Sequence, residues 1–124
     1  MFATVLPVAI GGAIGATARY LTGVVAVRVM GHGFPWGTLT VNIVGSFLMG
    51  LIIVYMAERS GHRLAPFLVT GILGSYTTFS SFSLDALVIY ERGQIGIAAA
   101  YVTASVMLSL GAIFAGLVVA RNLV

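Results

Sequence analysis

Four long apolar stretches alternate with three short polar turns along the chain. Each stretch has about the 20 residues that a helix needs to cross a bilayer. The turns carry most of the charged residues, together with Gly and Pro. We therefore predict an all-α membrane protein, a single domain over residues 1–124 with four transmembrane helices. The expected spans are 2–29, 37–57, 64–90 and 95–119.

The third stretch is interrupted between Gly71 and Ser83. Seven residues of this segment carry hydroxyl groups, and two glycines precede the pair Thr77-Thr78. Gly and β-branched Thr have low helix propensity, and Ser and Thr side chains compete for backbone groups. We predict a helix broken near residues 74–78. Non-helical backbone at membrane depth is tolerated only where protein buries it or water reaches it, so the break is a candidate ion site.

Composition supports the membrane assignment. Apolar residues make up 60 % of the chain and charged residues 7 %, against about 25 % charged in soluble domains. The absence of cysteine excludes disulfides and thiolate metal sites. The net charge of +3 is too diffuse to suggest nucleic acid. We expect a multi-pass protein of the cell (inner) membrane, in contact with the lipid bilayer. Four spans enclose little space alone, so an oligomer is expected.

Two polar residues lie deep inside the first and second spans. Arg19 is about nine residues short of Arg28, too deep to reach the headgroups easily, so we expect it to line a watery vestibule. Asn42 needs a hydrogen-bond partner in the hydrocarbon. It either bonds another helix or presents its amide to an anion. Thr38 and Ser46 are each four residues from Asn42 and share its helix face.

Further polar residues lie in the third and fourth spans. Asp85 is the only acid at membrane depth, and pairing with Arg19 is as plausible as a direct functional role. Tyr101, Ser105 and Ser109 fall four residues apart on one helix face. We call these three residues the polar track. They indicate either an ion pathway or hydrogen bonding within the bundle.

Small residues and charges bear on assembly. Gly11, Gly12, Gly15 and Ala16 permit close helix contact, inside the chain or at a dimer face. Four spans place Arg59, Arg63 and Arg121 on one side of the membrane, and Arg28 and Arg92 on the other. So weak a bias permits insertion both ways up, and hence an antiparallel pair of identical chains.

Three motifs resemble the small fluoride channels called Fluc or CrcB, over essentially the whole chain. They are Gly11-Gly-Ala-Ile-Gly-Ala-Thr-Ala-Arg-Tyr20, Gly37-Thr-Leu-Thr-Val-Asn42 with Gly45, and Gly71-Ile-Leu-Gly followed by Thr77-Thr-Phe-Ser-Ser-Phe-Ser83. Their common order and spacing make the resemblance specific.

The resemblance implies a dual-topology antiparallel homodimer with two fluoride pores. It implies pore roles for Asn42, Phe79, Phe82, the polar track and a vestibule role for Arg19. It also implies a structural sodium ion held by the backbone carbonyls of Gly74 and Thr77 from both subunits. The chain departs from the usual pattern at Ser75, where a second glycine is common, and at Asp85, where glutamate is usual.

The residue chemistry suits fluoride, a small and strongly hydrated anion. Donors must replace its water in a low-dielectric slab, and Asn42, Thr78, Ser81 and Tyr101 can donate. The electropositive ring edges of Phe79 and Phe82 can face an anion without trapping it. We expect a passive fluoride channel and not an enzyme.

Two other classes of membrane protein remain as alternatives. A four-span proton-coupled multidrug exporter needs a membrane-embedded carboxylate, typically in the first span, whereas that span carries Arg19 and no acid. A non-transporting assembly subunit does not need so many hydroxyls at mid-membrane. An intramembrane enzyme is disfavoured because no Ser–His, His–Glu or two-Asp arrangement lies at matching depth.

Overall fold

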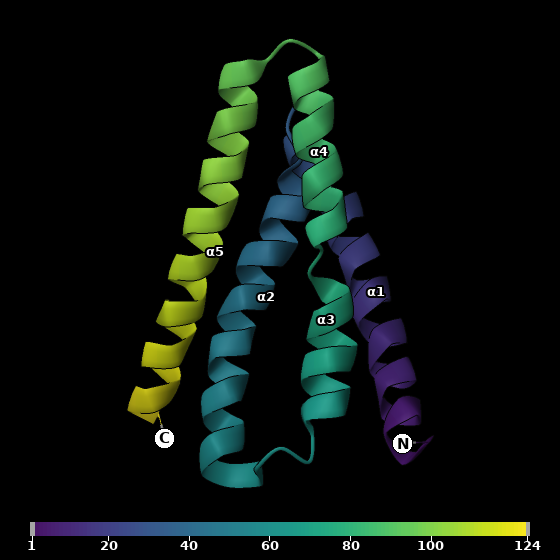
Figure 1. Cartoon of the computed structure of the whole chain (residues 1–124), viewed down its shortest axis with the longest axis vertical. Coiled ribbons are helices and arrows are strands. Elements are labelled where there is room, and N and C mark those ends of the chain that lie inside the picture. Colours follow the sequence, from purple (N-terminus) through teal and green to yellow (C-terminus); the bar gives the residue numbers. More distant parts are fainter. Residues whose placement is uncertain (1, 124) are drawn as a thin grey trace.

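The computed structural model describes residues 2–123 and consists of helices joined by short turns (Figure 1). Within these residues, four helical segments are long and apolar enough to cross a membrane, the number expected from the sequence. Met1 and Val124, the ends of the predicted domain, lie outside the described residues. The elements are α1 (Phe2–Met30), α2 (Trp36–Tyr55), two π-helical segments (Met56–Ser60 and Pro66–Leu73), α3 (Gly74–Tyr76), α4 (Phe79–Glu91) and α5 (Ile95–Leu123).

The four spans run along the long axis of the molecule (Figure 1). Both termini and the turn after α2 lie at one end, and the turn between α4 and α5 lies at the other (Figure 1). Gly31 follows α1 with φ 82°, and Gly93 follows α4 with φ 81°. A glycine adopts this left-handed conformation without steric cost, so both helices stop where the sequence predicts turns. The antiparallel pairing of two copies stays a prediction.

The break in the third span lies at Thr77 and Thr78. Thr77 has φ −82° and ψ 160°, and Thr78 has φ −153° and ψ 118°, so both are extended. Figure 1 shows a short stretch of non-helical chain between α3 and α4. The interruption therefore falls within the predicted residues 74–78. Gly74 itself is helical, with φ −62° and ψ −30°, so the glycine does not produce the break.

The glycines near the break serve close packing instead. A Cβ atom on Gly15 would overlap the carbonyl oxygen of Ile72, and one on Gly11 would press on the backbone of Gly71. The small residues of α1 thus contact the second π-helical segment, Pro66–Leu73, of the same chain. A second close crossing, of α2 on α5, meets at Gly50 and Gly116. This crossing was not predicted from the sequence, although its small residues are spaced for it.

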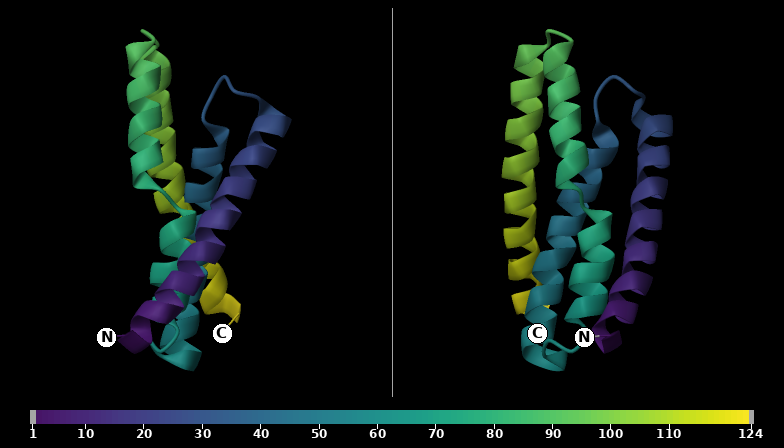
Figure 2. Two further views of the ribbon diagram at one scale, coloured as in Figure 1. Left: turned by 90° about the vertical axis from the view of Figure 1, so that its right-hand side faces the viewer. Right: turned by 45° about the vertical axis from the view of Figure 1, so that its right-hand side comes forward.

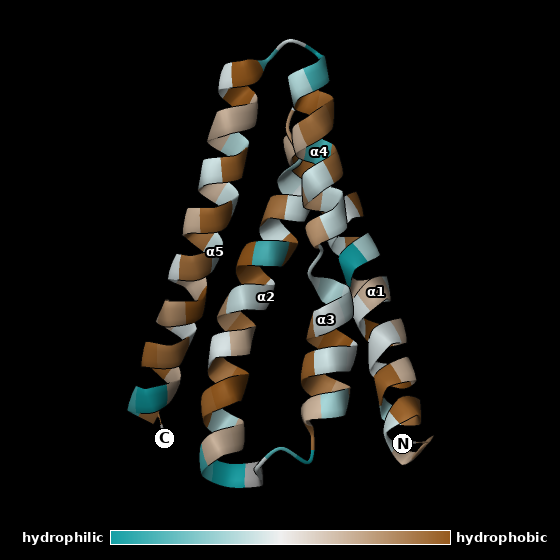
Figure 3. Cartoon of the chain, in the orientation of Figure 1, coloured by the Kyte–Doolittle hydropathy of each residue, from teal (hydrophilic) through white to brown (hydrophobic). Residues whose placement is uncertain are grey.

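Hydrophobic residues recur along all the long helices, with few strongly hydrophilic ones between them (Figure 3). Large hydrophobic side chains on α1 and α5 are exposed, as lipid or a second protein surface requires. A small core lies among α2, α4 and α5. It consists of Leu39, Phe82, Ile89, Ala98 and Tyr101.

Candidate ion pathway around the broken helix

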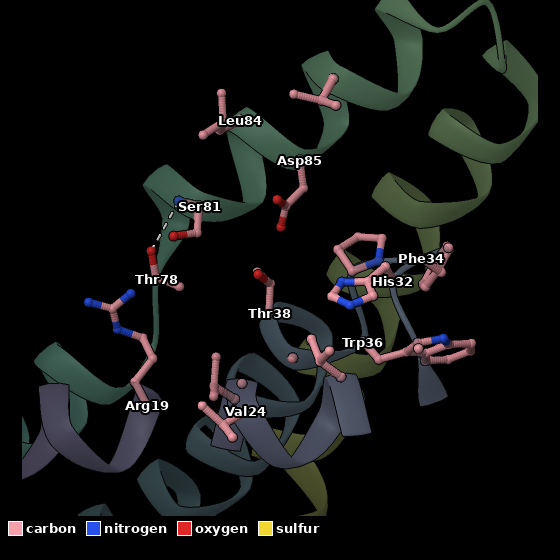
Figure 4. Close-up of a pocket in the computed structure, with 18 of the residues that line it drawn as sticks. Arg19, Val24, His32, Phe34, Trp36, Thr38, Thr78, Ser81, Leu84 and Asp85 are labelled. Carbon is pink, nitrogen blue, oxygen red and sulfur yellow. Dashed lines mark hydrogen bonds between the residues drawn. The ribbon is translucent and has the colours of Figure 1, made fainter. Parts of the chain in front are cut away.

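Two hollows lie on either side of the break. The first, which we call the cleft, has a volume of about 780 Å³ and lies between α1, the turn at 31–35 and α4. Figure 2 shows α1 and α4 diverging toward the end of the molecule where their turns lie. Thr38 and Val41 of α2 also line it. Figure 4 shows Thr38, Ser81 and Asp85 around this space, with His32 beside them.

The second hollow, which we call the groove, has a volume of about 440 Å³ and lies between α2, the break and α5. None of the described side chains that line it is ionisable. Thr78 lines both hollows. The groove brings together most of the predicted pore residues: Asn42, Thr78, Phe79, Phe82, Ser105 and Ser109.

Asn42 holds the backbone of Thr78. The Thr78 amide donates to Asn42 Oδ1 at 2.8 Å, and Asn42 Nδ2 donates to the Thr78 carbonyl at 3.1 Å. The Thr78 hydroxyl accepts a hydrogen bond from the Ser81 amide at 3.1 Å and so caps α4. Asn42 therefore has the partner that the sequence required, and one amide hydrogen of its Nδ2 group is left for another acceptor.

The same bonds divert two amide donors from their helical acceptors. In a continuous helix the Thr78 amide would bond to the carbonyl of Gly74, and the Ser81 amide to that of Thr77. Here both amides donate to side chains instead. The two carbonyls predicted to hold a cation thus lack the amide partners that a helix would give them. Both carbonyls would offer a cation oxygen ligands, which hard cations prefer.

Residues of α1 hold the other side of the break. Arg19 Nε donates to the Ser75 carbonyl at 3.1 Å, and Thr22 Oγ1 lies 3.1 Å from Tyr76 Oη. Arg19 also lines the cleft, where the sequence analysis expected a vestibule. The bond between Thr22 and Tyr76 was not predicted, because neither residue stands out in an apolar helix.

Three aromatic rings connect the break to α5. The centroids of Phe79 and Phe82 lie 5.5 Å apart, and those of Phe82 and Tyr101 lie 5.3 Å apart. Phe82 is buried, whereas the side chain of Phe79 is 78 % exposed. Phe82 is therefore fixed inside the chain, and Phe79 presents its ring to whatever surrounds the groove.

The polar track begins at Tyr101, the third of these rings. Tyr101 is fully buried, and its hydroxyl donates to Asp85 Oδ2 at 3.1 Å. Asp85 thus pairs with Tyr101 and not with Arg19. Ser105 is only 5 % exposed, and its hydroxyl has no hydrogen-bond partner within residues 2–123.

Not every predicted neighbour shares a hollow. Thr38 lies on the same helix as Asn42 and Ser46 at the predicted four-residue spacing, but it lines the cleft while they line the groove. Ser81 also lines the cleft, and Tyr101 packs behind Phe82. Sequence spacing placed these residues on helices correctly but did not separate the two sides of the break.

Comparison with known proteins identifies the chain's relatives. Residues 6–117 match the family model described as CrcB-like protein, Camphor Resistance (CrcB). Proteins named fluoride-specific ion channel FluC are similar over nearly their whole length. That of Cereibacter sphaeroides is 58 % identical over 122 residues, 98 % of each chain. That of Agrobacterium fabrum is 56 % identical over 118 residues, 94 % of each. The chain therefore belongs to the CrcB-like family of multi-pass membrane proteins.

Proposed function

We propose that this chain forms a fluoride-selective channel that lets fluoride leave the cell passively across the inner membrane. The names of its relatives support fluoride as the transported ion, and the groove supports a pathway for that ion along the chain. The observation that carries the proposal is the Ser105 hydroxyl, buried in the groove without a partner. Leaving such a group unpaired costs about 1–3 kcal/mol, and an anion that accepts its hydrogen removes that cost.

The groove offers donors without full charges. The free amide hydrogen of Asn42 and the hydroxyls of Ser105 and Ser109 can replace water around a fluoride ion. A fixed cation here would trap the anion, and a carboxylate would repel it, whereas conduction needs binding that is weak and repeated. The ring edges of Phe79 and Phe82 add weak positive potential between these donors.

We infer that two copies assemble antiparallel and form two pores. The ring of Phe79 is 78 % exposed, an arrangement expected if it completes a pore wall with a second subunit. The small difference in arginines between the two ends permits both orientations in the membrane. Each pore would then combine the groove of one subunit with residues of its partner.

We further propose that a sodium ion joins the two breaks through the carbonyls of Gly74 and Thr77. Bound there, it would link the subunits by ionic attraction to four carbonyl dipoles. The proposal is tested by purifying the protein in N-methyl-D-glucamine instead of sodium. We expect a smaller dimer fraction in size-exclusion chromatography, restored by sodium. An unchanged dimer at the lowest attainable sodium concentration would exclude the site.

The channel function is tested in liposomes loaded with potassium fluoride and diluted into fluoride-free buffer with valinomycin. We expect rapid fluoride release, measured with a fluoride electrode, and no release of chloride from matched liposomes. Release equal to that from protein-free liposomes, or equal for both halides, would refute a fluoride-selective channel.

The proton-coupled exporter is the weaker alternative. Its mechanism needs a carboxylate that exchanges protons with a cationic substrate, but α1 carries Arg19 at membrane depth and no acid. Asp85, the acid nearest the break, accepts a hydrogen bond from Tyr101. A pH gradient that drives ethidium out of the same liposomes would favour the exporter.

A further inference from the structure

The charged side chains around the two hollows all belong to the cleft. Three arginines and one aspartate line it, which leaves a formal charge of +2 with His32 neutral. None of the described side chains lining the groove is ionisable. The charged residues of the cleft are Arg19, Arg28, Asp85 and Arg92.

These arginines lie at different depths. Arg19 is part-buried and donates to the Ser75 carbonyl beside the break. Arg28 lies in the last turn of α1, and Arg92 immediately follows α4; both are exposed. Arg28 and Arg92 thus stand at the mouth of the cleft, and Arg19 at its inner end.

Without these two arginines the cleft would carry no net formal charge, because only Arg19 and Asp85 would remain. The C-terminal ends of α1 and α4 flank the mouth from two sides, and each carries a partial negative charge from the helix dipole. The first turn of α2, at Trp36 and Gly37, also lines the cleft and carries a partial positive charge. Asp85 adds a carboxylate farther in. The net positive charge of the cleft therefore depends on Arg28 and Arg92, its two exposed arginines.

We propose that Arg28 and Arg92 capture fluoride electrostatically at the mouth of the cleft, before it reaches the neutral donors of the groove. The inference rests on the proposed channel function. Charge of one sign in a low-dielectric cleft raises the local concentration of the opposite ion and its rate of entry, and added salt screens the effect. The two arginines thus control how fast fluoride enters, and the groove controls which ion passes.

A purely structural role for the same residues makes a different prediction. Cations at helix C-termini also stabilise the helices themselves. Loss of that stabilisation would lower the amount of folded dimer, but it would not make transport per folded dimer depend on salt. Ionic strength therefore separates capture from stabilisation.

The experiment measures fluoride release per purified dimer at low fluoride, for Arg28→Gln, Arg92→Gln and the unchanged chain. It is run at one fixed pH for all three proteins. The Debye length is about 20 Å at 20 mM salt and a few ångström near 1 M. We expect each variant to release fluoride about three- to tenfold more slowly at 20 mM. The difference should vanish near 1 M.

Two controls sharpen the result. Arg121→Gln removes the same charge from the last turn of α5, outside both hollows, and should leave release unchanged at both salt concentrations. Arg28→Lys keeps the charge and should restore the rate at low salt. Equal release by all variants at 20 mM salt, or a loss that persists at 1 M, would overturn the capture proposal. Neither result would bear on the channel function itself, which is tested separately by fluoride release from the unchanged chain.

Discussion

The Asn42 side chain bonds the Thr78 backbone twice, accepting from its amide and donating to its carbonyl. The extended conformation of Thr77 and Thr78 separates the Thr78 amide from its helical acceptor in α3, the Gly74 carbonyl. At membrane depth this amide would otherwise remain unpaired at a cost of several kcal/mol. The asparagine on α2 is thus a condition for a break at this place, besides its proposed role toward the anion.

Replacing Asn42 by aspartate tests this relationship. In Asn42→Asp one carboxylate oxygen still accepts from the Thr78 amide, but the other faces the Thr78 carbonyl without a hydrogen to donate. We expect fluoride release to stop and the free energy of unfolding to fall by about 1–3 kcal/mol. Release is measured in liposomes, and stability by thermal denaturation in detergent.

A threonine that bonds only to its own helix serves as the control. Thr17 is exposed, and its hydroxyl donates to the Ala13 carbonyl of the same helix at 2.7 Å. Thr17→Val should therefore leave release and stability near those of the unchanged chain. A normal release rate in Asn42→Asp would remove Asn42 from the pathway.

The phenylalanines of the groove differ in burial, so the same substitution should separate transport from stability. We expect Phe79→Ile and Phe82→Ile both to abolish fluoride release, because each loses an electropositive ring edge. Phe82→Ile should also cost about 1–2 kcal/mol of stability, whereas Phe79→Ile, with its exposed side chain, should cost little within the subunit. Both should still elute as dimers in size-exclusion chromatography.

Phe114 gives the matched control for these variants. It lies on α5 with its side chain 65 % exposed, and it lines neither hollow. Phe114→Ile should conduct fluoride normally. If Phe79→Ile or Phe82→Ile releases fluoride at the same rate as Phe114→Ile, that ring has no part in the pore.

The four spans and the position of the break could be predicted because both depend on local composition. Apolar length sets the spans, and hydroxyl-rich sequence marks the interruption. The conformation within the break could not be predicted, because it depends on α2: Asn42 selects Thr78 by bonding its backbone. Gly71 and Gly74 were taken as helix breakers, yet Gly71 packs against Gly11 and Gly74 stays helical.

The candidate site could be predicted as a set of residues but not as an arrangement. A four-residue spacing indicates a shared helix face, so the polar track was visible in the sequence. That spacing does not tell which helix lies opposite, so the division between cleft and groove was missed. The partner of Asp85 was left open for the same reason, because Tyr101 is 16 residues away on another helix.

Close packing of α1 on the third span predicts a specific sensitivity at Gly15. In Gly15→Ala the added methyl group overlaps the Ile72 carbonyl, which is backbone and cannot move alone. We expect a loss of about 1–3 kcal/mol in stability from overpacking, together with slower fluoride release because α1 also holds Ser75 and Tyr76. The midpoint of thermal denaturation measures the first effect.

Gly111 provides the comparison for this variant. It lies inside α5, and a Cβ atom there would meet no other atom of the chain within 4 Å. Gly111→Ala should therefore be neutral or stabilising by up to about 1 kcal/mol, from helix propensity alone. Equal melting temperatures for the two variants would show that α1 does not approach the third span as closely as described.

Ser105 allows a test in which stability and transport change in opposite directions. Its hydroxyl is buried without a partner, so Ser105→Ala removes an unpaired polar group and should leave stability equal or higher. If that hydroxyl donates to fluoride, release should fall by about tenfold, the equivalent of one hydrogen bond of about 1.4 kcal/mol. Thr103→Ala, on an exposed position of the same helix, should change neither quantity. A Ser105→Ala protein that is more stable and conducts normally would show that the hydroxyl is a packing residue, and the pathway would have to run elsewhere.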